Sequence, residues 1–409
     1  MHKAGVDLRC DDEESTMRSW RRYEWNWGCD EDQPNRETIN HVRFWDFTED
    51  EQGDSHPTFG GGNVISDDRI REVVKFRKIR EVIVDAKISD AALDLISRLP
   101  EIKAIQISAK GRLNSSHINL FAKANKLRTL KVWTESCAGP GVPYFRGLGK
   151  LTNLDCLEIN YRFYDSPQLT RELCGELANL SRLKILRLDM GKMDYPPDFS
   201  SLKELGELQT FSTSMDDSGM VLPELATLPH LIELRLEPHA KMSVNFAAIA
   251  KLTTLESLTL DLWFFRGNSD MSFFGELSFV PRLRRLELER GECLTGAEFA
   301  GLSSTTLEEL RVDYCFHFAD QGLVNLAKGT NLKTLTLMNC LEISDEGIRA
   351  LEKMTNLERL EIEYEGGPKP DGLTADGLRA LKEKLPKCFI SLRQYSKETG
   401  MSVDVVSLK

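Results

Sequence analysis

The sequence predicts an α/β solenoid, a fold in which one small structural unit is repeated along the chain. Three observations support this prediction. Residues 307–362 contain three copies of the apolar pattern L-x-x-L-x-L, and the copies begin 25 residues apart. The same pattern recurs from residue 79 onward with spacings of 23 to 29 residues, which makes about twelve copies in all. Most segments between the copies place apolar residues three and four positions apart, as an amphipathic helix does.

The period and the leucine pattern of these copies resemble those of the leucine-rich repeat family. The resemblance implies a curved horseshoe with a parallel β-sheet on its concave face and helices or irregular turns on its convex face. Each repeat buries its strand leucines against its neighbours, so no repeat is stable by itself. The sixth copy is the weakest, because Thr213 occupies a position where the pattern requires an apolar residue.

Two cysteines occupy equivalent positions in consecutive copies. Cys315 and Cys340 each follow the last strand position by three residues, where leucine-rich repeats carry Asn or Cys to hydrogen-bond the turn. They are followed by F-A-D-x-G-L and I-S-D-x-G-I, and this combination resembles the cysteine-containing, ribonuclease-inhibitor-like type of the family. We interpret both residues as buried structural thiols rather than as redox or metal sites.

The segments that return the chain from one strand to the next are predicted to be mostly helical. The sequences with helical spacing are DAALDLISRL, PQLTRELCGELANL, VNFAAIAKL, DQGLVNLAKG and DEGIRALEKM. Short polar residues precede the apolar positions of several of them. We expect Asp90, Asp320 and Asp345 to cap the first helical turns, each contributing about 1 kcal/mol.

The solenoid is expected to span residues 76–365 and to be capped at both ends. An open solenoid exposes the apolar edge of its first repeat, and residues 41–47 alternate like a strand that can pair with the strand at 79–85. We therefore predict a polar, tryptophan-rich cap within residues 1–75. Residues 366–409 form the predicted C-terminal cap. An alternative for the first segment is an aromatic and basic patch at residues 20–23 that grips a peptide or nucleic acid.

The cap predictions rest on particular residues. The N-terminal tryptophans are Trp20, Trp25, Trp27 and Trp45. Near the other end, residues 385–392 are predicted to form the final edge strand.

The composition limits which classes of partner and which cellular compartment are expected for this protein. The net charge of −11 and the isoelectric point of about 5.4 argue against nucleic acid or an anionic membrane as the main partner. No run of 18 apolar residues is present, and the first residues have no apolar core for a secretory signal. The nine cysteines show no disulfide framework. A cytoplasmic protein is therefore expected.

The strand positions that face away from the core are predicted to be acidic. Successive side chains of a strand alternate between faces, so the third, fifth and seventh positions of each copy point onto the concave sheet. These positions carry thirteen acidic and six basic residues. The seventh position supplies the candidate residues for binding a basic protein by long-range steering, as the ribonuclease inhibitor does on a similar fold: Asp189, Glu237, Asp261, Glu289, Asp313 and Glu363. The alternative is a solvated cross-strand network in which Arg235, Arg285 and Arg311 offset the repulsion.

Three long linkers begin at residues 133, 161 and 263 and are rich in aromatic residues. Leucine-rich repeats usually place such extra length on the rim beside the strands. Large aromatic side chains are frequent at interface hot spots. The candidate rim residues are Trp133, Tyr161, Phe163, Trp263 and Phe264. The alternative is that these rings only cover the solenoid core.

The sequence shows no pattern of catalysis and predicts neither a cofactor nor a metal. Its histidines lack metal-ligand spacing, and it contains neither a G-x-S-x-G elbow nor a phosphate loop. A zinc site at Cys10, Cys29 and His41 remains an alternative. We therefore expect a non-enzymatic protein-protein interaction module. The other candidates are a substrate-recognition subunit of a ubiquitin-ligase-like complex and an enzyme with an unrecognised site.

Overall fold

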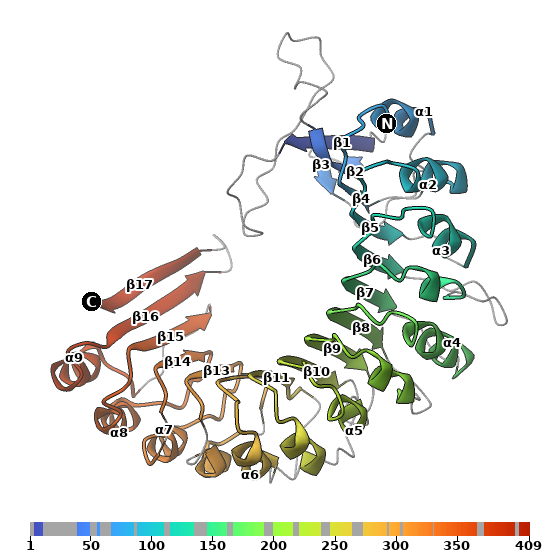
Figure 1. The fold of residues 1–409 in the computed structure, drawn as a ribbon. Coiled ribbons are helices and arrows are strands. Elements are labelled where there is room, and N and C mark those ends of the chain that lie inside the picture. Colours follow the sequence, from blue (N-terminus) through green and yellow to red (C-terminus); the bar gives the residue numbers. More distant parts are fainter. Residues whose placement is uncertain are drawn as a thin grey trace. The chain divides into compact units, whose positions relative to one another are not determined.

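The computed structural model divides the chain into two compact units, Met1–Leu208 and Gln209–Lys409, which we call the N-terminal unit and the C-terminal unit. Each unit is described by itself (Figure 1). The described residues are 4–10, 39–49, 55–57, 67–85, 88–109, 115–134, 145–161, 167–191, 199–215, 221–238, 246–263, 273–292, 294–302, 306–329, 331–365, 372–396 and 401–409.

The N-terminal unit contains a parallel sheet in which each strand is hydrogen-bonded to the next along the chain. Its strands are β2 (Ile39–Glu49), β4 (Glu81–Asp85), β5 (Ala104–Ala109), β6 (Thr129–Thr134), β7 (Cys156–Tyr161) and β8 (Ile185–Gly191). Two further strands, β1 (Ala4–Cys10) and β3 (Ser55–Pro57), pair antiparallel with β2. The predicted pairing of residues 41–47 with the strand at 79–85 is confirmed, because His41 lies opposite Glu81 and Phe44 opposite Val84.

Short helices connect the parallel strands of the N-terminal unit. They are α1 (Asp67–Val73), α2 (Asp90–Ser97), α3 (Ser115–Phe121), α4 (Pro167–Leu177) and the 3₁₀ helices η1 (Leu148–Lys150) and η2 (Ser200–Glu204). Figure 1 shows α1, α2 and α3 stacked on one side of strands β4 to β6. The other side of this sheet therefore displays its outward-facing strand residues.

The C-terminal unit repeats this arrangement with more strands. The parallel strands are β9 (Thr210–Met215), β10 (Glu233–Pro238), β11 (Ser257–Asp261), β12 (Arg285–Glu289), β13 (Glu309–Asp313), β14 (Thr334–Met338), β15 (Arg359–Glu365) and β16 (Phe389–Ser396). Strand β17 (Met401–Leu408) then pairs antiparallel with β16. The prediction that residues 385–392 form the final edge strand is wrong, because the alternating sequence MSVDVVSL continues the sheet by one more strand.

The return segments of the C-terminal unit are α-helical or 3₁₀-helical. They are α5 (Leu222–Leu225), η4 (Phe246–Lys251), α6 (Phe273–Glu276), η5 (Leu277–Phe279), η6 (Ala297–Leu302), α7 (Asp320–Leu326), α8 (Asp345–Ala350), η7 (Leu351–Lys353) and α9 (Ala375–Lys384). Within the segment VNFAAIAKL, predicted as an amphipathic helix, Phe246–Lys251 form the 3₁₀ helix η4. A 3₁₀ helix rises about 2.0 Å per residue against about 1.5 Å in an α-helix, so fewer residues cover the same distance.

The predicted leucine pattern forms the core of both units. All three pattern positions of every copy are buried, and they stack in register from strand to strand, as in Leu286, Leu310, Leu335 and Leu360. Burying such a side chain fully contributes about 1.5–3 kcal/mol. Even Thr213, the irregular residue of the sixth copy, is only 1% exposed. The pattern therefore specifies the interior as predicted.

The helix caps differ from the prediction. The side chain that accepts a hydrogen bond from the first helical turn belongs to Ser89 in α2, to Ser344 in α8 and to Thr374 in α9. The predicted capping residues Asp90 and Asp345 are the first residues inside their helices instead. The prediction that Asp90 and Asp345 cap their own helices is therefore wrong, since a preceding hydroxyl already satisfies the amide. Asp320 likewise lies inside α7, whose N-cap residue is Ala319 and has no side-chain cap.

The aspartates connect each repeat to the next one. Asp320 accepts hydrogen bonds from the backbone nitrogen and the hydroxyl of Ser344, at 2.7 and 2.5 Å. Asp345 makes the same two contacts with Thr374, at 2.8 and 2.6 Å. In the N-terminal unit, Asp67 accepts a hydrogen bond from the hydroxyl of Ser89. These contacts hold a helix and the capping residue of the following helix together.

A glycine three residues after the capping hydroxyl makes this contact possible. A Cβ atom on Gly347 would lie 2.2 Å from Oδ1 of Asp320, and one on Gly377 would lie 2.1 Å from Oδ1 of Asp345. Both distances are far shorter than a van der Waals contact. The space that a side chain would occupy is therefore taken by the carboxylate of the preceding repeat.

Candidate functional site

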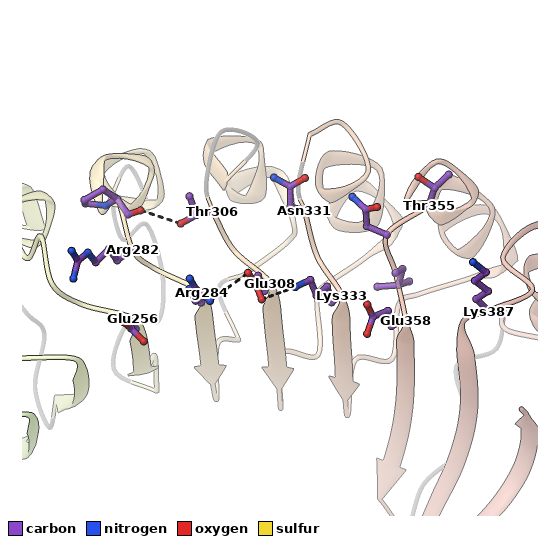
Figure 2. Close-up of a pocket in the computed structure, with 13 residues that line it drawn as sticks. Glu256, Arg282, Arg284, Thr306, Glu308, Asn331, Lys333, Thr355, Glu358 and Lys387 are labelled. Carbon is purple, nitrogen blue, oxygen red and sulfur yellow. Dashed lines mark hydrogen bonds and ion pairs between the residues drawn. The ribbon is translucent and has the colours of Figure 1, made fainter.

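A hollow of about 800 Å³ follows the N-terminal ends of the strands in the C-terminal unit (Figure 2). Its charged side chains are of both signs. Glu308 forms ion pairs with Nζ of Lys333 at 3.0 Å and with Nη1 of Arg284 at 3.8 Å. The hydrogen bond from Lys333 lowers the pKa of Glu308. Glu308 is therefore neutralised by cations of the two neighbouring repeats.

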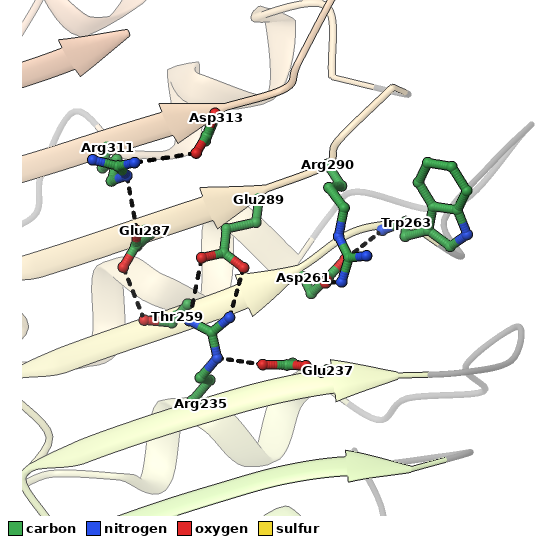
Figure 3. Close-up of polar contacts among 10 residues, drawn as sticks. All are labelled: Arg235, Glu237, Thr259, Asp261, Trp263, Glu287, Glu289, Arg290, Arg311 and Asp313. Carbon is green, nitrogen blue, oxygen red and sulfur yellow. Dashed lines mark hydrogen bonds and ion pairs between the residues drawn. The ribbon is translucent and has the colours of Figure 1, made fainter. Parts of the chain in front are cut away.

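Two arginines bridge the outward-facing acidic residues of the C-terminal unit (Figure 3). Arg235 of β10 reaches across β11 to Glu289 of β12, with Nη2 to Oε2 at 2.7 Å, and it also contacts Glu237. Arg311 of β13 lies 2.9 Å from Glu287 and 3.1 Å from Asp313. The expected offsetting of repulsion by Arg235 and Arg311 is confirmed. The third expected arginine, Arg285, makes no ion pair with the described residues.

Partial burial changes the protonation equilibria of this network. Burial raises the pKa of Glu287, and the neighbouring Glu289 raises it further. Burial also raises the pKa of Asp313, although Arg311 opposes the shift. For Arg235, burial lowers the pKa, but hydrogen bonds to Glu237 and Glu289 outweigh this effect and raise it. The arginine thus stays charged while the carboxylates lose part of their hydration.

The remaining predicted acidic residues also have polar partners. Glu363 of β15 lies 3.5 Å from Nε of Arg393. In the N-terminal unit, Asp189 of β8 accepts a hydrogen bond from Nδ2 of Asn160 at 2.7 Å. Each of the six candidate acidic residues contacts a basic or amide group, which is the arrangement of a cross-strand network.

Two predicted site residues meet at the C-terminal end of β11. Asp261 is only 1% exposed, and its carboxylate contacts the guanidinium of Arg290. The same carboxylate accepts a hydrogen bond from the backbone nitrogen of Trp263 at 3.0 Å. The guanidinium carbon of Arg290 lies 5.8 Å from the centroid of the Trp263 ring, within the range of a cation–π interaction. Asp261 thus holds an arginine and a tryptophan beside each other.

The backbone turns sharply after three successive strands. Arg290, Tyr314 and Asn339 occupy equivalent positions and have φ angles of 55°, 49° and 54°. This left-handed conformation costs about 1–2 kcal/mol for residues other than glycine. It persists because each of these amides donates a hydrogen bond to the next strand, as Arg290 does to the carbonyl of Asp313 at 2.8 Å. Only Asn339 is of a residue type that signals this turn in a sequence.

Exposed apolar side chains follow two of these turns and the end of strand β11. Trp263, Phe316 and Leu341 are 39%, 37% and 38% exposed. The ring of Tyr314 lies edge-on to that of Phe316, with centroids 6.1 Å apart. The hydroxyl of Tyr314 donates a hydrogen bond to Glu365, and this bond, together with burial, raises the pKa of Tyr314 to about 12.

We call these five residues the rim cluster: Trp263, Arg290, Tyr314, Phe316 and Leu341. Sequence reasoning found only Trp263 among them. The others follow the strands of repeats whose linkers are of ordinary length, so linker length gave no signal for them.

The other predicted aromatic residues are placed differently. Trp133 lies within strand β6 rather than in a linker, opposite Asn160 of β7, and its Nε1 donates to Glu158 at 3.2 Å. The prediction that it begins a rim loop is wrong because β6 extends beyond the leucine pattern. Tyr161 is the last residue of β7. The predicted residues that lie outside the described part of the chain are Phe163, Phe264, Trp20, Trp25, Trp27 and Cys29.

Among the described residues, metal-ligand clusters are absent and the two cysteines of the repeat pattern are buried. Within these residues, no group of three or more His, Cys, Asp or Glu side chains is arranged to hold a metal ion. Cys315 and Cys340 are buried, and their thiols donate to the backbone carbonyls of Asp313 at 3.4 Å and Met338 at 3.6 Å. Burial raises the pKa of Cys340 well above its ordinary value. Both thiols are therefore buried, as the sequence predicted.

The helices described here are also too short or too polar to cross a bilayer.

Neither a protein-family model nor a curated protein matches this sequence. Among solved structures, a chain of the TLR13–ssRNA13 complex aligns over 81% of this chain with 16% identity and a TM-score of 0.53, and the alignment covers 47% of that chain. The chain thus spans about half the length of its TLR13 neighbour. The likeness agrees with the repeat pattern, the buried leucines and the parallel strands. The chain has the leucine-rich repeat solenoid fold.

Two further solved structures are similar. The internalin InlF of Listeria monocytogenes str. 4b F2365 aligns over 85% of this chain and 91% of its own, with 15% identity and a TM-score of 0.45. The yeast Rad7 and Elc1 complex contains a chain that aligns over 82% of this chain and 86% of its own, with 16% identity and a TM-score of 0.46.

Proposed function

We propose that this chain is a non-enzymatic protein-interaction module that binds a partner protein through the rim cluster and the adjoining strand face of the C-terminal unit. The observation that carries the proposal is the row of exposed apolar side chains on a backbone fixed by inter-strand hydrogen bonds. Trp, Tyr and Arg are the residues most enriched at interface hot spots, and the rim cluster contains all three.

The rim cluster is arranged before any partner binds. Asp261 contacts the guanidinium of Arg290 and the backbone nitrogen of Trp263, and Arg290 lies over the Trp263 ring, so both residues are held in place in the free protein. Binding then costs less side-chain entropy, because an immobilised rotamer-rich side chain otherwise costs about 0.5–1.5 kcal/mol. We assign Asp261 this supporting role, since its burial keeps it from direct contact with a partner.

The outward-facing acidic residues are proposed to attract a basic partner. Glu237, Glu289, Asp313 and Glu363 keep side-chain exposures of 28%, 21%, 15% and 13% beside their arginines. Carboxylates at such an interface increase the association rate and select against acidic partners more than they add affinity. Asp189 is proposed to act in the same way in the N-terminal unit.

The proposal also covers the type of the C-terminal repeats, further aromatic contacts and the class of partner. We assign the repeats that contain Cys315 and Cys340 to the cysteine-containing type. Tyr161, Phe163 and Phe264 are proposed as additional aromatic contacts. The net charge of −11 favours protein over nucleic acid or an anionic membrane as the main partner.

The test compares capture of partners by the tagged full-length chain and two variants. The rim variant combines Trp263→Ala, Phe316→Ala and Leu341→Ala. The control, Phe279→Ala, removes an aromatic ring that is 67% exposed and lies outside the rim cluster. Captured proteins are quantified by mass spectrometry at low and moderate salt. We expect a set of basic proteins to be retained by the control and reduced about tenfold or more by the rim variant.

Two checks make the outcome decisive. Circular dichroism and thermal melting must show that both variants fold, which their surface positions favour, since such substitutions usually change stability by less than about 0.5 kcal/mol. Equal capture by the wild type and the rim variant would contradict the proposed surface.

A further inference from the structure

The N-terminal unit carries two rows of side chains along the edge where its strands begin. The first row consists of the residues directly before β4 to β8, namely Arg80, Lys103, Arg128, Asp155 and Lys184. The second row lies two residues earlier and consists of Lys78, Glu101, Lys126, Asn153 and Arg182. The first row is continuous, because each backbone nitrogen donates to the carbonyl of the preceding member, at 2.7 to 2.9 Å. We call both rows together the basic edge.

The basic edge has more cations than its own carboxylates can neutralise. It contains seven basic and two acidic residues. Lys126 pairs with Glu101 at 2.6 Å, and Arg128 lies 3.9 Å from Asp155. The other five basic residues are exposed and form no ion pair with any described residue; they are Lys78, Arg80, Lys103, Arg182 and Lys184.

Three cations of the basic edge act on the carboxylate of Glu101. The hydrogen bond from Lys126 lowers the pKa of Glu101, and the charges of Lys103 and Arg80 lower it further. Cations of three repeats therefore act on one carboxylate. Neighbouring strands lie about 4.8 Å apart, well within one Debye length at physiological salt, so these charges repel one another in the free protein.

We propose that the basic edge binds an extended acidic segment of a partner protein. Five adjacent strands span about 19 Å at this spacing, and an extended peptide of about six residues covers that length. Carboxylates on such a segment reach the exposed cations from both rows. Arg80 and Arg182 present planar guanidinium groups that can hold a carboxylate through two parallel hydrogen bonds. The surface differs from the rim cluster in residues, in unit and in the charge of its partner.

A peptide fits the basic edge better than a nucleic acid does. Glu101 and Asp155 interrupt the cations, and a peptide can place neutral residues opposite them, whereas a nucleic acid carries a phosphate at every nucleotide. Neither row contains an aromatic side chain on which a base can stack, although stacking contributes about 1–3 kcal/mol per base in single-strand binding. The net charge of −11 adds a long-range repulsion that grows with the charge density of the ligand.

The test uses the full-length protein and fluorescence anisotropy of a labelled oligoglutamate peptide of about ten residues, which is long enough to span the edge. The edge variant combines Arg80→Glu, Lys103→Glu and Lys184→Glu. The control variant combines Arg282→Glu, Arg285→Glu and Lys387→Glu, three exposed basic residues of the C-terminal unit. Both variants change the net charge by the same amount, so they separate a local site from a general effect of charge.

We expect the wild type and the control variant to bind oligoglutamate at ~20 mM salt, and to bind it more weakly at ~150 mM, where the Debye length is about 8 Å. The edge variant should bind about tenfold more weakly or worse, because three attractions become repulsions. Oligoglutamine should not bind any of the three proteins.

Three outcomes would overturn the proposal. The first is no binding of oligoglutamate by the wild type at low salt. The second is an equal loss of affinity in the edge and control variants. The third is a single-stranded oligonucleotide that binds the wild type more tightly than oligoglutamate and is lost in the edge variant, which would assign the edge to nucleic acid instead. Circular dichroism shows whether the edge variant is folded.

Discussion

The same edge of the sheet carries different electrostatics in the two units. In the N-terminal unit, the residues directly before the strands are basic except for Asp155, and most of them have no acidic partner among the described residues. In the C-terminal unit, the residues directly before β11 to β15 alternate in sign: Glu256, Arg284, Glu308, Lys333 and Glu358. Glu308 there pairs with Lys333 at 3.0 Å and with Arg284 at 3.8 Å (Figure 2).

This difference shows that different positions of a leucine-rich repeat determine the fold and the surface charge. The buried leucines of both units are equivalent and determine the path of the backbone. The positions between them contribute little to folding, so one scaffold can present a self-neutralised edge in one unit and a charged edge in another. The chemistry of a partner is therefore encoded in positions that the repeat pattern leaves free.

The largest expected effect on the free energy of unfolding tests whether the buried leucines of the two units are equivalent. Leu157 of β7 and Leu310 of β13 are 0% and 1% exposed and occupy the same pattern position. Leu157→Ala and Leu310→Ala should each lower the free energy of unfolding by about 2–5 kcal/mol, because each leaves a cavity. Urea unfolding, with hydrogen exchange to report on each unit, measures both. A cost below about 1 kcal/mol in one unit alone would contradict the equivalence.

A smaller effect is expected for the contacts between repeats, and it should differ between the units. Asp320 accepts two hydrogen bonds from Ser344, whereas Asp67 accepts one from Ser89. Asp320→Ala should therefore lower the free energy of unfolding by about 1–3 kcal/mol, and Asp67→Ala by about 0.5–1.5 kcal/mol. The control is Asp376→Ala, whose side chain is 89% exposed. Equal costs for Asp320→Ala and Asp376→Ala in urea unfolding would contradict this role.

The smallest effect concerns pH and has opposite signs in the two units. In the N-terminal unit, Lys126 lowers the pKa of Glu101, so the stability that Glu101 contributes is present above its unfolded pKa of about 4.5 and is lost as pH falls through the folded value. In the C-terminal unit, burial raises the pKa of Glu287. Glu287 therefore favours folding below the unfolded pKa and opposes it once pH rises through the folded value.

These signs lead to opposite outcomes for two matched variants. At pH 7, Glu101→Gln should lower the free energy of unfolding, whereas Glu287→Gln should raise it by less than about 1 kcal/mol, since solvent screens this half-exposed carboxylate. Urea unfolding at pH 4 and pH 7 measures both changes, and carboxyl NMR titration gives the two pKa values directly. A folded pKa of Glu287 below that of Glu101 would contradict the contrast.

The part of the site that was predicted correctly depends on alternation along a strand. Alternation placed Glu237 and Glu289 on the outward face and put Arg235 within diagonal reach, as the structure shows. It could not show that Asp261 is buried, because that burial depends on Arg290, which follows the next strand along the sheet. Linker length did not predict Arg290, Tyr314, Phe316 and Leu341 of the rim cluster, because they follow strands of repeats whose linkers are of ordinary length.

The basic edge is a different case, because it can be read from the sequence once the starts of the strands are known. Arg80, Lys103, Arg128 and Lys184 each follow the first apolar residue of the pattern and directly precede a strand. The predicted binding residues instead came from the outward-facing strand positions, since these define the sheet surface. That Arg80, Lys103 and Lys184 are exposed and form no ion pair with the described residues still required the structure.

The sequence by itself determined the repeat, the buried leucines and the parallel sheet, because a pattern of period 23 to 29 residues is local and recurs along the chain. The tertiary structure decided which charges meet and which remain unpaired. Arg235 and Glu289 are 54 residues apart in the chain, and Asp320 and Ser344 are 24 apart. Such contacts depend on side-chain directions across neighbouring repeats, where a shift of a few ångströms separates an ion pair from two solvated charges.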